Sequence, residues 1–462
     1  MLGDTIAAVS TPRGRGGVAM IRISGTRAVE IASRVFVPKN GRALAEMPVR
    51  TAVYGAIVEQ AASGERASVD DGIAIVYRAP ASFTGEDTVE LTCHGGMLLT
   101  ETVLAAVIAA GARCAEAGEF TRRAFINGKL GLSAAEALGE LLEAQTRAQM
   151  KLAHAGMRGR LEGRCREIYD KLCTVLASIY VKIDYPDEDL AELSAEEIAQ
   201  AFGECEEMLA ALVATYRTGH AVSEGVSTVI CGRPNVGKSS LYNRLVGREA
   251  AIVTAVEGTT RDLLSETVAL GGVTLRLFDT AGLHDTSDPV ERIGIDRARR
   301  AMEEAELILA VFDGSEMPTS EDLSLIKELG ERSATVIAVI NKRDLGETGV
   351  GAYESAFTHT VSICAADGAG MGALATLVEG LFLTEGINLD CDPVLANARQ
   401  HGAAAGALDA VRRARESLMS GEPIELACAD AEAAMQCISE VDGRAVSEDI
   451  VTQIFSRFCV GK

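Results

Sequence analysis

The 462-residue sequence has no tryptophan, only 4% aromatic residues and no two cysteines in a CxxC arrangement. Its eleven cysteines are scattered, which argues against a disulfide framework and against a zinc ribbon. No uninterrupted apolar run reaches the ~18 residues that a membrane helix needs, and the N-terminus lacks the long apolar region of a signal peptide. We therefore expect a reduced, cytoplasmic protein with no membrane partner.

Positive charge is also scarce, because 44 lysines and arginines stand against 66 aspartates and glutamates, a formal net charge of −22. Such a chain cannot hold a nucleic acid on a uniformly basic surface and would need a local basic patch. Residues 1–50 depart from this balance, with eight basic and three acidic residues. A solvated face is one interpretation of this excess, and anion binding is the other.

The length predicts two to four domains at about 150 residues each. Residues 1–127 consist of short β-rich segments separated by turn residues, which indicates a compact α+β unit. Residues 128–222 and 386–462 are helical in pattern, whereas strand-like runs alternate with helical patterns over residues 223–385, as in a parallel sheet. The simplest architecture is a multidomain α/β plus α protein, with the α/β unit inserted into one discontinuous helical domain.

The strongest local signal is the sequence GRPNVGKS, which follows a strand-like run and precedes a helical pattern. In this context a glycine lets the backbone curve around phosphates, and the amides at the helix start supply a positive field. Lys238 would neutralise charge on the β and γ phosphates, and Ser239 can bind Mg²⁺. The residues predicted to bind the nucleotide here are Asn235, Val236, Gly237, Lys238, Ser239 and Ser240.

Two motifs further along the chain predict the rest of the phosphate and magnesium site. The sequence DTAG closes an apolar run, so Asp279 can hold Mg²⁺ through water and the Gly282 amide can sense the γ-phosphate. A GTTRD segment lies between this motif and the GRPNVGKS motif, which we call the P-loop. A switch threonine is expected at this place in the sequence, so Thr260 is added to the predicted magnesium site.

The sequence NKRD follows another strand-like run and predicts the base. The Asp344 carboxylate can accept both hydrogen bonds from N1 and the 2-amino group of guanine, a demand that adenine cannot meet. Asn341 and Lys342 complete this motif, and the amide of Ala365 can meet guanine O6. The four motifs occur in the order of the translation-factor branch of GTPases, which this region resembles. We therefore expect GTP and GDP binding.

The residue that orients the attacking water is less obvious. Many GTPases have Gln directly after the second-switch glycine, but here the residue is Leu283, which offers no hydrogen bond. Glu291 lies in the following segment and is the candidate for this role, directly or through a second water. The alternative is a solvated glutamate at a helix start, beside Arg292.

Further motifs lie outside the GTPase-like α/β region at residues 223–385, which we call the G domain. They are TPRGRGG at 11–17, RISG at 22–25, SFTGED at 82–87, CHGG at 93–96, GEFTRRAFINGK at 118–129, IDYPDED at 183–189 and the terminal FCVGK. In their joint order around a central GTPase, they make essentially the whole chain resemble the MnmE (TrmE) family of tRNA-modification GTPases.

The resemblance implies a three-part fold and a function in tRNA modification. It implies an N-terminal tetrahydrofolate-binding-like domain at residues 1–127, a discontinuous helical domain at 128–222 and 386–462, and an inserted G domain at 223–385. Such proteins form homodimers through the N-terminal domain and act with a flavin-dependent partner of the MnmG (GidA) family. They help to install an aminomethyl or carboxymethylaminomethyl group at carbon 5 of the tRNA wobble uridine, with a tetrahydrofolate derivative as the one-carbon source.

The resemblance also implies roles for single residues. The Asn235 side chain would bind a potassium ion, with main-chain oxygens around Thr254, Val256 and Thr259, and Glu291 would orient the water. The residues implied to contact folate are Arg22, Glu90, Lys129 and the C-terminal Lys462. Cys459 would be a functional thiol, although a cysteine between Phe458 and Val460 is also typical of a small buried apolar residue.

Two other functions are open to a chain with this G domain. A GTP-dependent ribosome-assembly factor usually carries a KH-type RNA domain or a second G domain, whereas this chain has one P-loop and no basic GxxG segment after it. A membrane-associated regulator of ion transport would need a membrane span. The chain also departs from the family pattern, because Cys364 stands where serine is usual in the last guanine-contacting loop.

Overall fold

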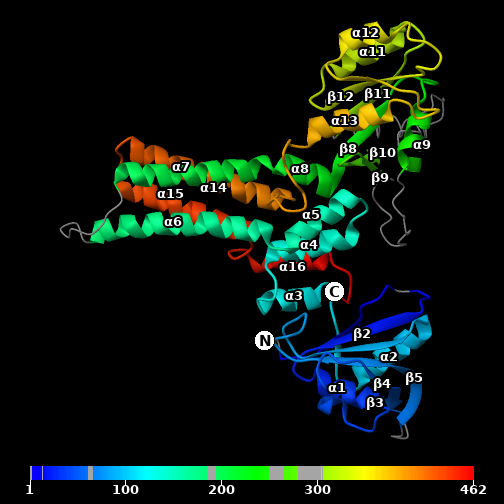
Figure 1. Ribbon diagram of the computed structural model, residues 1–462, viewed down its shortest axis with the longest axis vertical. Helices are drawn as coiled ribbons and strands as arrows, with labels where there is room; N and C mark the ends of the chain where they lie inside the picture. The colour runs from blue at the N-terminus through cyan, green and yellow to red at the C-terminus, as the bar shows by residue number, and fades with distance from the viewer. Residues whose placement is uncertain are drawn as a thin grey trace. The chain divides into compact units, whose positions relative to one another are not determined.

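The computed structural model describes residues 3–12, 14–60, 66–184, 194–248, 265–278, 303 and 305–461 (Figure 1). The chain forms two compact units, one from Met1–Gly139 with Gly443–Lys462 and one from Glu140–Asp442. Within the described ranges, no helix combines the length and apolar character that crossing a membrane requires.

The first unit is built on a seven-stranded sheet with the order β3-β4-β5-β6-β2-β1-β7. Its strands are β1 (Ile6–Val9), β2 (Val18–Ser24), β3 (Phe36–Pro38), β4 (Val53–Gln60), β5 (Arg66–Tyr77), β6 (Thr88–His94) and β7 (Arg113–Cys114). Alternate residues of β2, such as Ile21 and Ile23, pack in one core with helices α1 (Ala28–Val35) and α2 (Met97–Ala109). Because side chains alternate along a strand, Arg22 lies on the opposite face of the sheet.

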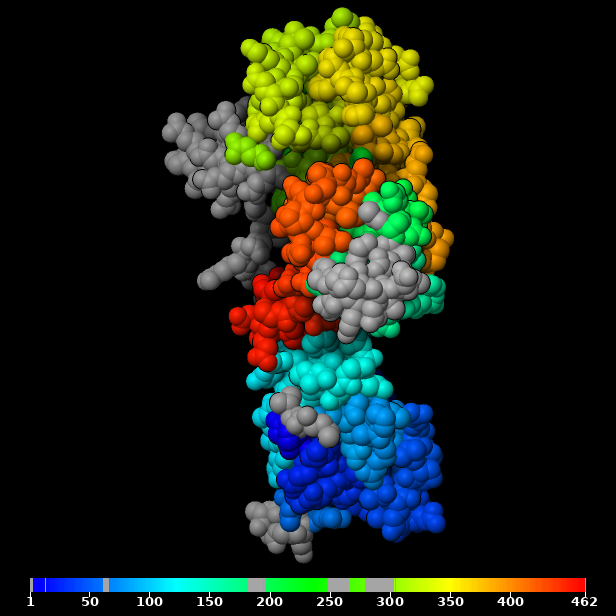
Figure 2. All heavy atoms as spheres, turned by 90° about the vertical axis from the view of Figure 1, so that its left-hand side faces the viewer, coloured from blue at the N-terminus to red at the C-terminus, as the bar shows by residue number. Residues whose placement is uncertain are grey.

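The C-terminal end of the chain belongs to this first unit. Helix α16 (Glu448–Ser456) packs against α3 (Glu119–Ile126) and the start of α4 (Leu132–Glu143), and Figure 2 shows its red atoms beside their cyan ones. Beyond α16, Val460 forms an antiparallel bridge with Ala117, and Ser10 Oγ donates a hydrogen bond of 3.0 Å to the carbonyl of Gly461. Residues at the C-terminus therefore lie beside the end of β1.

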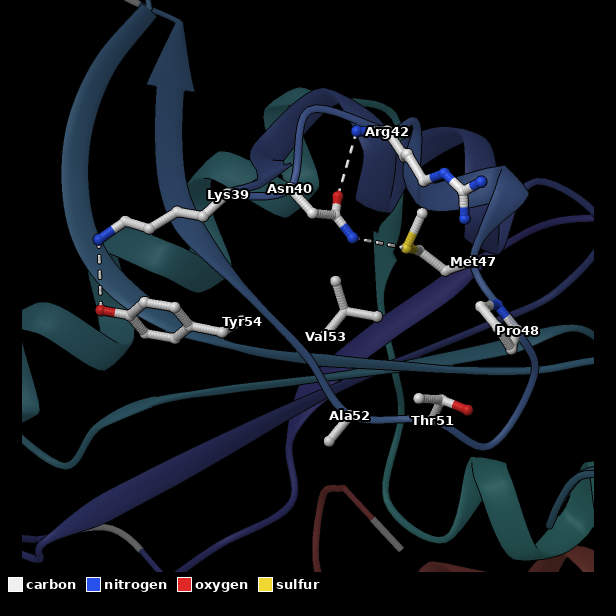
Figure 3. A pocket seen from close by; sticks show the side chains of 9 residues that line it. All are labelled: Lys39, Asn40, Arg42, Met47, Pro48, Thr51, Ala52, Val53 and Tyr54. Carbon is white, nitrogen blue, oxygen red and sulfur yellow. Dashed lines mark hydrogen bonds between the residues drawn. The ribbon is translucent and has the colours of Figure 1, made fainter.

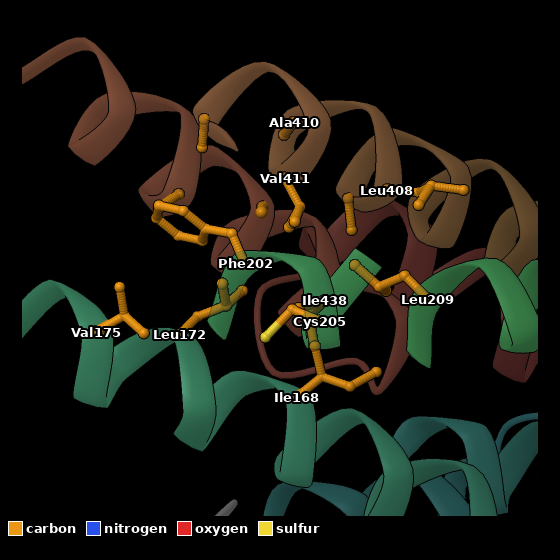
Figure 4. Packing of buried hydrophobic residues seen from close by; sticks show 14 of the residues in the cluster. Ile168, Leu172, Val175, Phe202, Cys205, Leu209, Leu408, Ala410, Val411 and Ile438 are labelled. Carbon is orange, nitrogen blue, oxygen red and sulfur yellow. The ribbon is translucent and has the colours of Figure 1, made fainter. Parts of the chain in front are cut away.

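The second unit contains a helical bundle. Its long helices are α6 (Arg160–Asp184), α7 (Ala195–Ala214), α14 (Ala398–Met419) and α15 (Ile424–Val441). Figure 4 shows their shared core, in which Phe202 and Leu209 of α7 meet Ile168 of α6 and Val411 of α14. The two helical segments of the sequence, on either side of the α/β segment, thus pack into one bundle.

The α/β part of this unit has a six-stranded sheet with the order β13-β12-β11-β8-β10-β9. Its strands are β8 (Val226–Cys231), β9 (Ser265–Leu270), β10 (Val273–Phe278), β11 (Leu307–Asp313), β12 (Thr335–Asn341) and β13 (Thr360–Ser362). The predicted parallel pairing is confirmed for all of them except β9, which pairs antiparallel to β10 at the edge. The flanking helices are α9 (Lys238–Arg248), α11 (Ser320–Leu329), α12 (Val350–Ala356) and α13 (Met371–Phe382).

Candidate nucleotide and folate sites

The P-loop follows β8, whose six residues are all buried in the centre of the sheet. Gly232 has a φ of +142°, and a Cβ there would lie 2.3 Å from the carbonyl oxygen of Val311. Gly237 has a φ of +101°, and a Cβ there would lie 2.1 Å from Asn341 Nδ2. Both positions therefore require glycine, because a side chain would strain the backbone and collide with a neighbouring strand end.

Lys238 spans this loop. Its Nζ donates hydrogen bonds of 2.8 Å to the carbonyls of Gly232 and Arg233, so the ammonium lies inside the curve of the backbone. Burial lowers the pKa of Lys238, since desolvation disfavours the charged ammonium. Ser239 and Ser240 are exposed in the first turn of α9, where backbone N–H groups have no helical acceptor. This arrangement can bind phosphate.

Asn341 joins the P-loop to the loop that follows β13. Its Nδ2 donates to the carbonyl of Val236 at 2.8 Å, and its Oδ1 accepts the N–H of Ala365 at 2.9 Å. One side chain thus ties together segments that are 105 and 24 residues away in the sequence. The role predicted for the Ala365 amide at guanine O6 stays a prediction.

Lys342 is anchored by a buried carboxylate. Its Nζ donates to Asp313 Oδ2 at 2.6 Å, and Ser315 Oγ donates to Asp313 Oδ1, also at 2.6 Å. Burial would raise the pKa of Asp313, but the hydrogen bonds from Lys342 and Ser315 outweigh it and lower this pKa. Asp313 is therefore a fixed anion, and the next loop residues, including the exposed Asp344, project from an anchored turn.

The loop at residues 364–366 is braced by Arg244 of α9. Arg244 Nε donates to the Ala365 carbonyl at 3.2 Å, and its Nη2 donates to the Ala366 carbonyl. The N–H of Asp367 favours the Cys364 thiolate, but burial and the nearby carboxylates, including that of Asp344, raise the pKa of this thiol. Sequence patterns do not single out Arg244, because its partners are main-chain carbonyls that carry no residue signature.

Several predicted residues of the nucleotide site lie outside the described residues. These are Thr254, Val256, Thr259, Thr260, Asp279, Gly282 and Glu291. The described part of the site comprises the phosphate loop, the NKRD segment and the 364–366 loop, which follow the carboxyl ends of the parallel strands β8, β12 and β13 of one sheet. Ligands of open α/β sheets bind at this edge.

The structure brings Arg22 and Glu90 together on the sheet of the first unit. They face each other across β2 and β6, with Arg22 Nε and Nη2 donating to Glu90 Oε1 at 3.0 and 2.8 Å. Their side chains are 12% and 17% exposed. Tyr77 Oη donates to Glu90 Oε2 at 3.2 Å, and burial, reinforced by the Glu90 charge, raises the pKa of Tyr77. Arg22 Nη1 is buried and has no hydrogen-bond partner among the described residues.

Two aromatic rings lie near the guanidinium of this ion pair. The Arg22 guanidinium carbon lies 5.2 Å from the ring centroid of Phe83 and 5.7 Å from that of Phe120. Lys129 is close to the same loop as Phe83, because its Nζ donates to the Pro80 carbonyl at 2.9 Å. A charged pair, an unused guanidinium N–H and aromatic faces can together bind a flat heterocycle with hydrogen-bonding edges.

Cys459 is exposed, so the alternative of a small buried apolar residue is wrong. Its carbonyl accepts a hydrogen bond of 3.4 Å from the N–H of Gly118, which holds the C-terminal segment against the start of α3 within the first unit. Lys462 lies outside the described residues.

Two of the motifs in the first unit build a buried ion network that sequence reasoning missed. The Arg123 side chain is only 1% exposed, and its guanidinium contacts Glu86 at 3.2 Å, Glu119 at 2.9 Å and Asp4 at 2.7 Å. Burial opposes the charge on Arg123, but these carboxylates raise its pKa. Removing one partner of such a buried pair typically costs about 3–5 kcal/mol, so we assign these motif residues a structural role.

The first unit also has a pocket of about 360 Å³ beside β3 and β4 (Figure 3). Lys39 and Tyr54 line one side of it, and Lys39 Nζ donates to Tyr54 Oη at 3.3 Å and to Asp71 Oδ2 at 3.1 Å. None of the residues predicted from the sequence to bind a ligand lines this pocket.

Family models and full-length relatives of one protein family match almost the whole chain. The family model for the MnmE helical domain matches residues 132–459, and that for the GTP-binding protein TrmE N-terminus matches residues 5–129. The chain is 43% identical over 465 residues to the tRNA modification GTPase MnmE of Symbiobacterium thermophilum, covering 99% of both chains. It is 37% identical to the protein of that name from Carboxydothermus hydrogenoformans, covering 100% of both.

Among solved structures, Era bound to MgGDPNP and nucleotides 1506–1542 of 16S ribosomal RNA is 28% identical, with a TM-score of 0.27. That alignment covers 40% of this chain and 65% of Era. The G domain of the T. maritima FeoB iron transporter is 25% identical, with a TM-score of 0.25, and the alignment covers 33% of this chain and 96% of that domain.

Proposed function

Since this chain belongs to the MnmE (TrmE) family of tRNA modification GTPases, we propose that it helps to modify carbon 5 of the tRNA wobble uridine together with an MnmG-type flavoprotein. The group installed would be aminomethyl or carboxymethylaminomethyl. The observation that carries the GTPase part is the Asn341 side chain, which joins the P-loop to the 364–366 loop. We also propose the three-domain division, with domain boundaries after residues 127, 222 and 385.

The proposal is tested by mass spectrometry of wobble nucleosides in total tRNA from cells that lack this protein. We expect the modified uridine to disappear and to return when the wild-type chain is supplied, but not when the Lys238→Ala variant is supplied. Unchanged wobble nucleosides together with accumulated ribosomal precursors would contradict the proposal and favour the ribosome-assembly alternative.

In the GTPase reaction, we propose that Lys238 holds the β and γ phosphates and that Asp344 selects guanine. The Lys238 ammonium already lies inside the P-loop, where it can exchange its two carbonyl contacts for phosphate oxygens. The hydroxyl of Ser239, with Thr260 and Asp279, would hold Mg²⁺, and Glu291 would orient the attacking water. Preorganised donors of this kind stabilise the charge that develops in the transition state.

We propose Asn235 as a side-chain ligand of potassium, with main-chain oxygens around Thr254, Val256 and Thr259. Asn235 is exposed at the P-loop and adopts a φ of +65°. Because its side chain is exposed, its carbonyl oxygen is accessible to a cation. When bound, a monovalent cation supplies positive charge that an arginine finger supplies in other GTPases.

Exchanging potassium for sodium is expected to lower GTP turnover at least tenfold, because the smaller ion fits a site built for potassium poorly. The variant Asn235→Gly should remove this difference, since glycine keeps the left-handed backbone and deletes only the carbonyl ligand. Asn243→Ala, an exposed asparagine on α9, is the matched control and should keep the potassium response. Equal turnover of the wild type in both salts would refute the assignment.

We propose that Arg22, Glu90 and Lys129, with Lys462, bind a tetrahydrofolate derivative. The support is the Arg22–Glu90 pair, whose guanidinium lies near the Phe83 and Phe120 rings, and the C-terminal segment held at the end of β1. Cys459, exposed on this segment, remains the candidate thiol. Calorimetry with a reduced formyl-folate should show weaker binding for Glu90→Ala than for Glu30→Ala, a surface control.

We propose that the chain forms a homodimer through the N-terminal domain. Four large apolar side chains are exposed on the sheet face opposite α1 and α2, namely Val18, Val37, Tyr54 and Ile73. Large apolar side chains exposed on one face of a sheet support a protein interface there. Light scattering should give twice the mass of one chain, and Ile73→Asp should lower it.

A further inference from the structure

Helix α5 (Arg147–Met157), with the residue that ends it, presents a row of basic side chains to solvent. Arg147, Lys151, His154 and Arg158 are all exposed, and they follow one another at intervals of four, three and four residues. At 3.6 residues per turn, this spacing places them within about 60° of one another around the helix axis. We call these four residues the α5 basic stripe.

The remainder of α5 is fixed in place, so the stripe has a defined direction. Leu152, on the opposite face, packs with Val222, Val394 and Ala396 in one buried cluster. Thr146 caps the start of the helix in a capping box with Gln149, whose Nε2 also donates to the Ser223 carbonyl at 3.0 Å. A helix held by its apolar face keeps its other side chains pointing into solvent.

The charge of the stripe is mostly not neutralised by the protein itself. Lys151 Nζ lies 3.0 Å from Asp390, but both side chains are more than half exposed, and such surface pairs are weak. Arg147, His154 and Arg158 have no ion pair or side-chain hydrogen bond within the described part of the chain. Arg160, exposed at the start of α6, extends the same basic region.

The basic excess of residues 1–50 does not offer a comparable surface. There Arg22 pairs with Glu90, Arg27 and Arg34 both pair with Glu30, and Lys39 pairs with Asp71. These carboxylates pair with four of the eight basic residues, and the exposed Arg15, Arg42 and Arg50 lie in separate turns and bends instead of in one row. In a chain with a net charge of −22, α5 is therefore the described element that best fits the local basic patch a polyanion would need.

We propose that the α5 basic stripe binds the sugar–phosphate backbone of tRNA, an inference that rests on the proposed function in which tRNA is the substrate. From Arg147 to Arg158 the stripe is about 16 Å long at about 1.5 Å per residue. This length follows several successive charges, since a duplex strand carries about one every 3.4 Å along its axis. Phosphate contacts position a nucleic acid without reading its sequence. The stripe would therefore contribute to the affinity for tRNA and to the position of the tRNA on the protein.

The test is a triple variant, Arg147→Gln, Lys151→Gln and Arg158→Gln, assayed for tRNA binding by fluorescence anisotropy at several salt concentrations. We expect the affinity at low salt to fall at least tenfold. The slope of log K against log salt should become shallower by roughly 2–3, because each lost phosphate contact removes roughly 0.7–0.9. GTP hydrolysis without tRNA should not change, since within the described residues no hydrogen bond or ion pair joins the stripe to the phosphate loop, the NKRD segment or the 364–366 loop.

The matched control is Lys171→Gln, Arg412→Gln and Arg413→Gln, which removes the same charge from exposed residues that are ion-paired to Glu204, Glu206 and Asp430. It should keep the wild-type affinity and slope. If the wild-type protein does not bind tRNA at any salt concentration, the proposed substrate itself is wrong. If the wild type binds tRNA and the triple variant keeps its affinity and slope, the stripe proposal is overturned while the proposed function stands. Unchanged tRNA binding with lost binding to the flavoprotein partner would equally overturn it, in favour of a protein surface.

Discussion

Replacing Gly237 with alanine is expected to abolish GTP binding, with an affinity loss of more than 100-fold. The new Cβ would lie 2.1 Å from Asn341 Nδ2, and the φ of +101° is unfavourable for any residue with a side chain. Asn341 also holds the Val236 carbonyl and the Ala365 amide, so displacing it disturbs the phosphate loop and the 364–366 loop together. Strain of this kind costs of order 1–3 kcal/mol before any contact is lost.

Binding of a fluorescent GTP analogue measures this effect, and circular dichroism shows whether the variant is folded. Gly247 is the control, because it lies on α9, the helix that begins directly after Gly237, and its Cβ would meet nothing within 4 Å. Gly247→Ala should bind GTP normally and gain about 0.5–1 kcal/mol of stability from helix propensity. Normal GTP binding by a folded Gly237→Ala variant would mean that this loop is not the phosphate site.

Replacing Asp344 with asparagine is expected to lower GTP affinity by about 10²–10⁴ and to raise the affinity for xanthosine triphosphate. The carboxylate would lose two hydrogen bonds from guanine, each about 1.5–3 kcal/mol because the acceptor is charged. Tenfold in affinity corresponds to about 1.4 kcal/mol. An asparagine amide can instead donate to the additional oxygen of xanthine.

Competition binding between GTP and xanthosine triphosphate measures this change in base preference. The control is Glu347→Gln, an exposed carboxylate three residues further on that is paired with Arg343. It should leave the preference for guanine unchanged. A variant at Asp344 that still prefers GTP would show that another group reads the base.

Much of the nucleotide site could be predicted because its chemistry is local. A P-loop needs glycine, lysine and serine at fixed spacing directly after a strand, and β8 and α9 lie on either side of this loop. The NKRD segment likewise follows a predicted strand, now β12. Alternation and run length also predicted the β-rich segments of residues 1–127 and the strand-like runs of residues 223–385, because the period of a strand depends on consecutive residues.

Tertiary structure alone decided which distant groups meet. The Asn341 bridge, the Arg244 brace on the 364–366 loop and the buried Arg123 network each join segments that no spacing rule connects. Packing likewise decided that four of the eight basic residues in 1–50 find carboxylates, whereas three of the four residues of the α5 basic stripe find none within the described residues. The sequence by itself determined local backbone conformation and the chemistry of each motif, because these depend on neighbouring residues. Which charges are neutralised and which loops are braced depends on the packing of whole elements, so only the folded chain decides them.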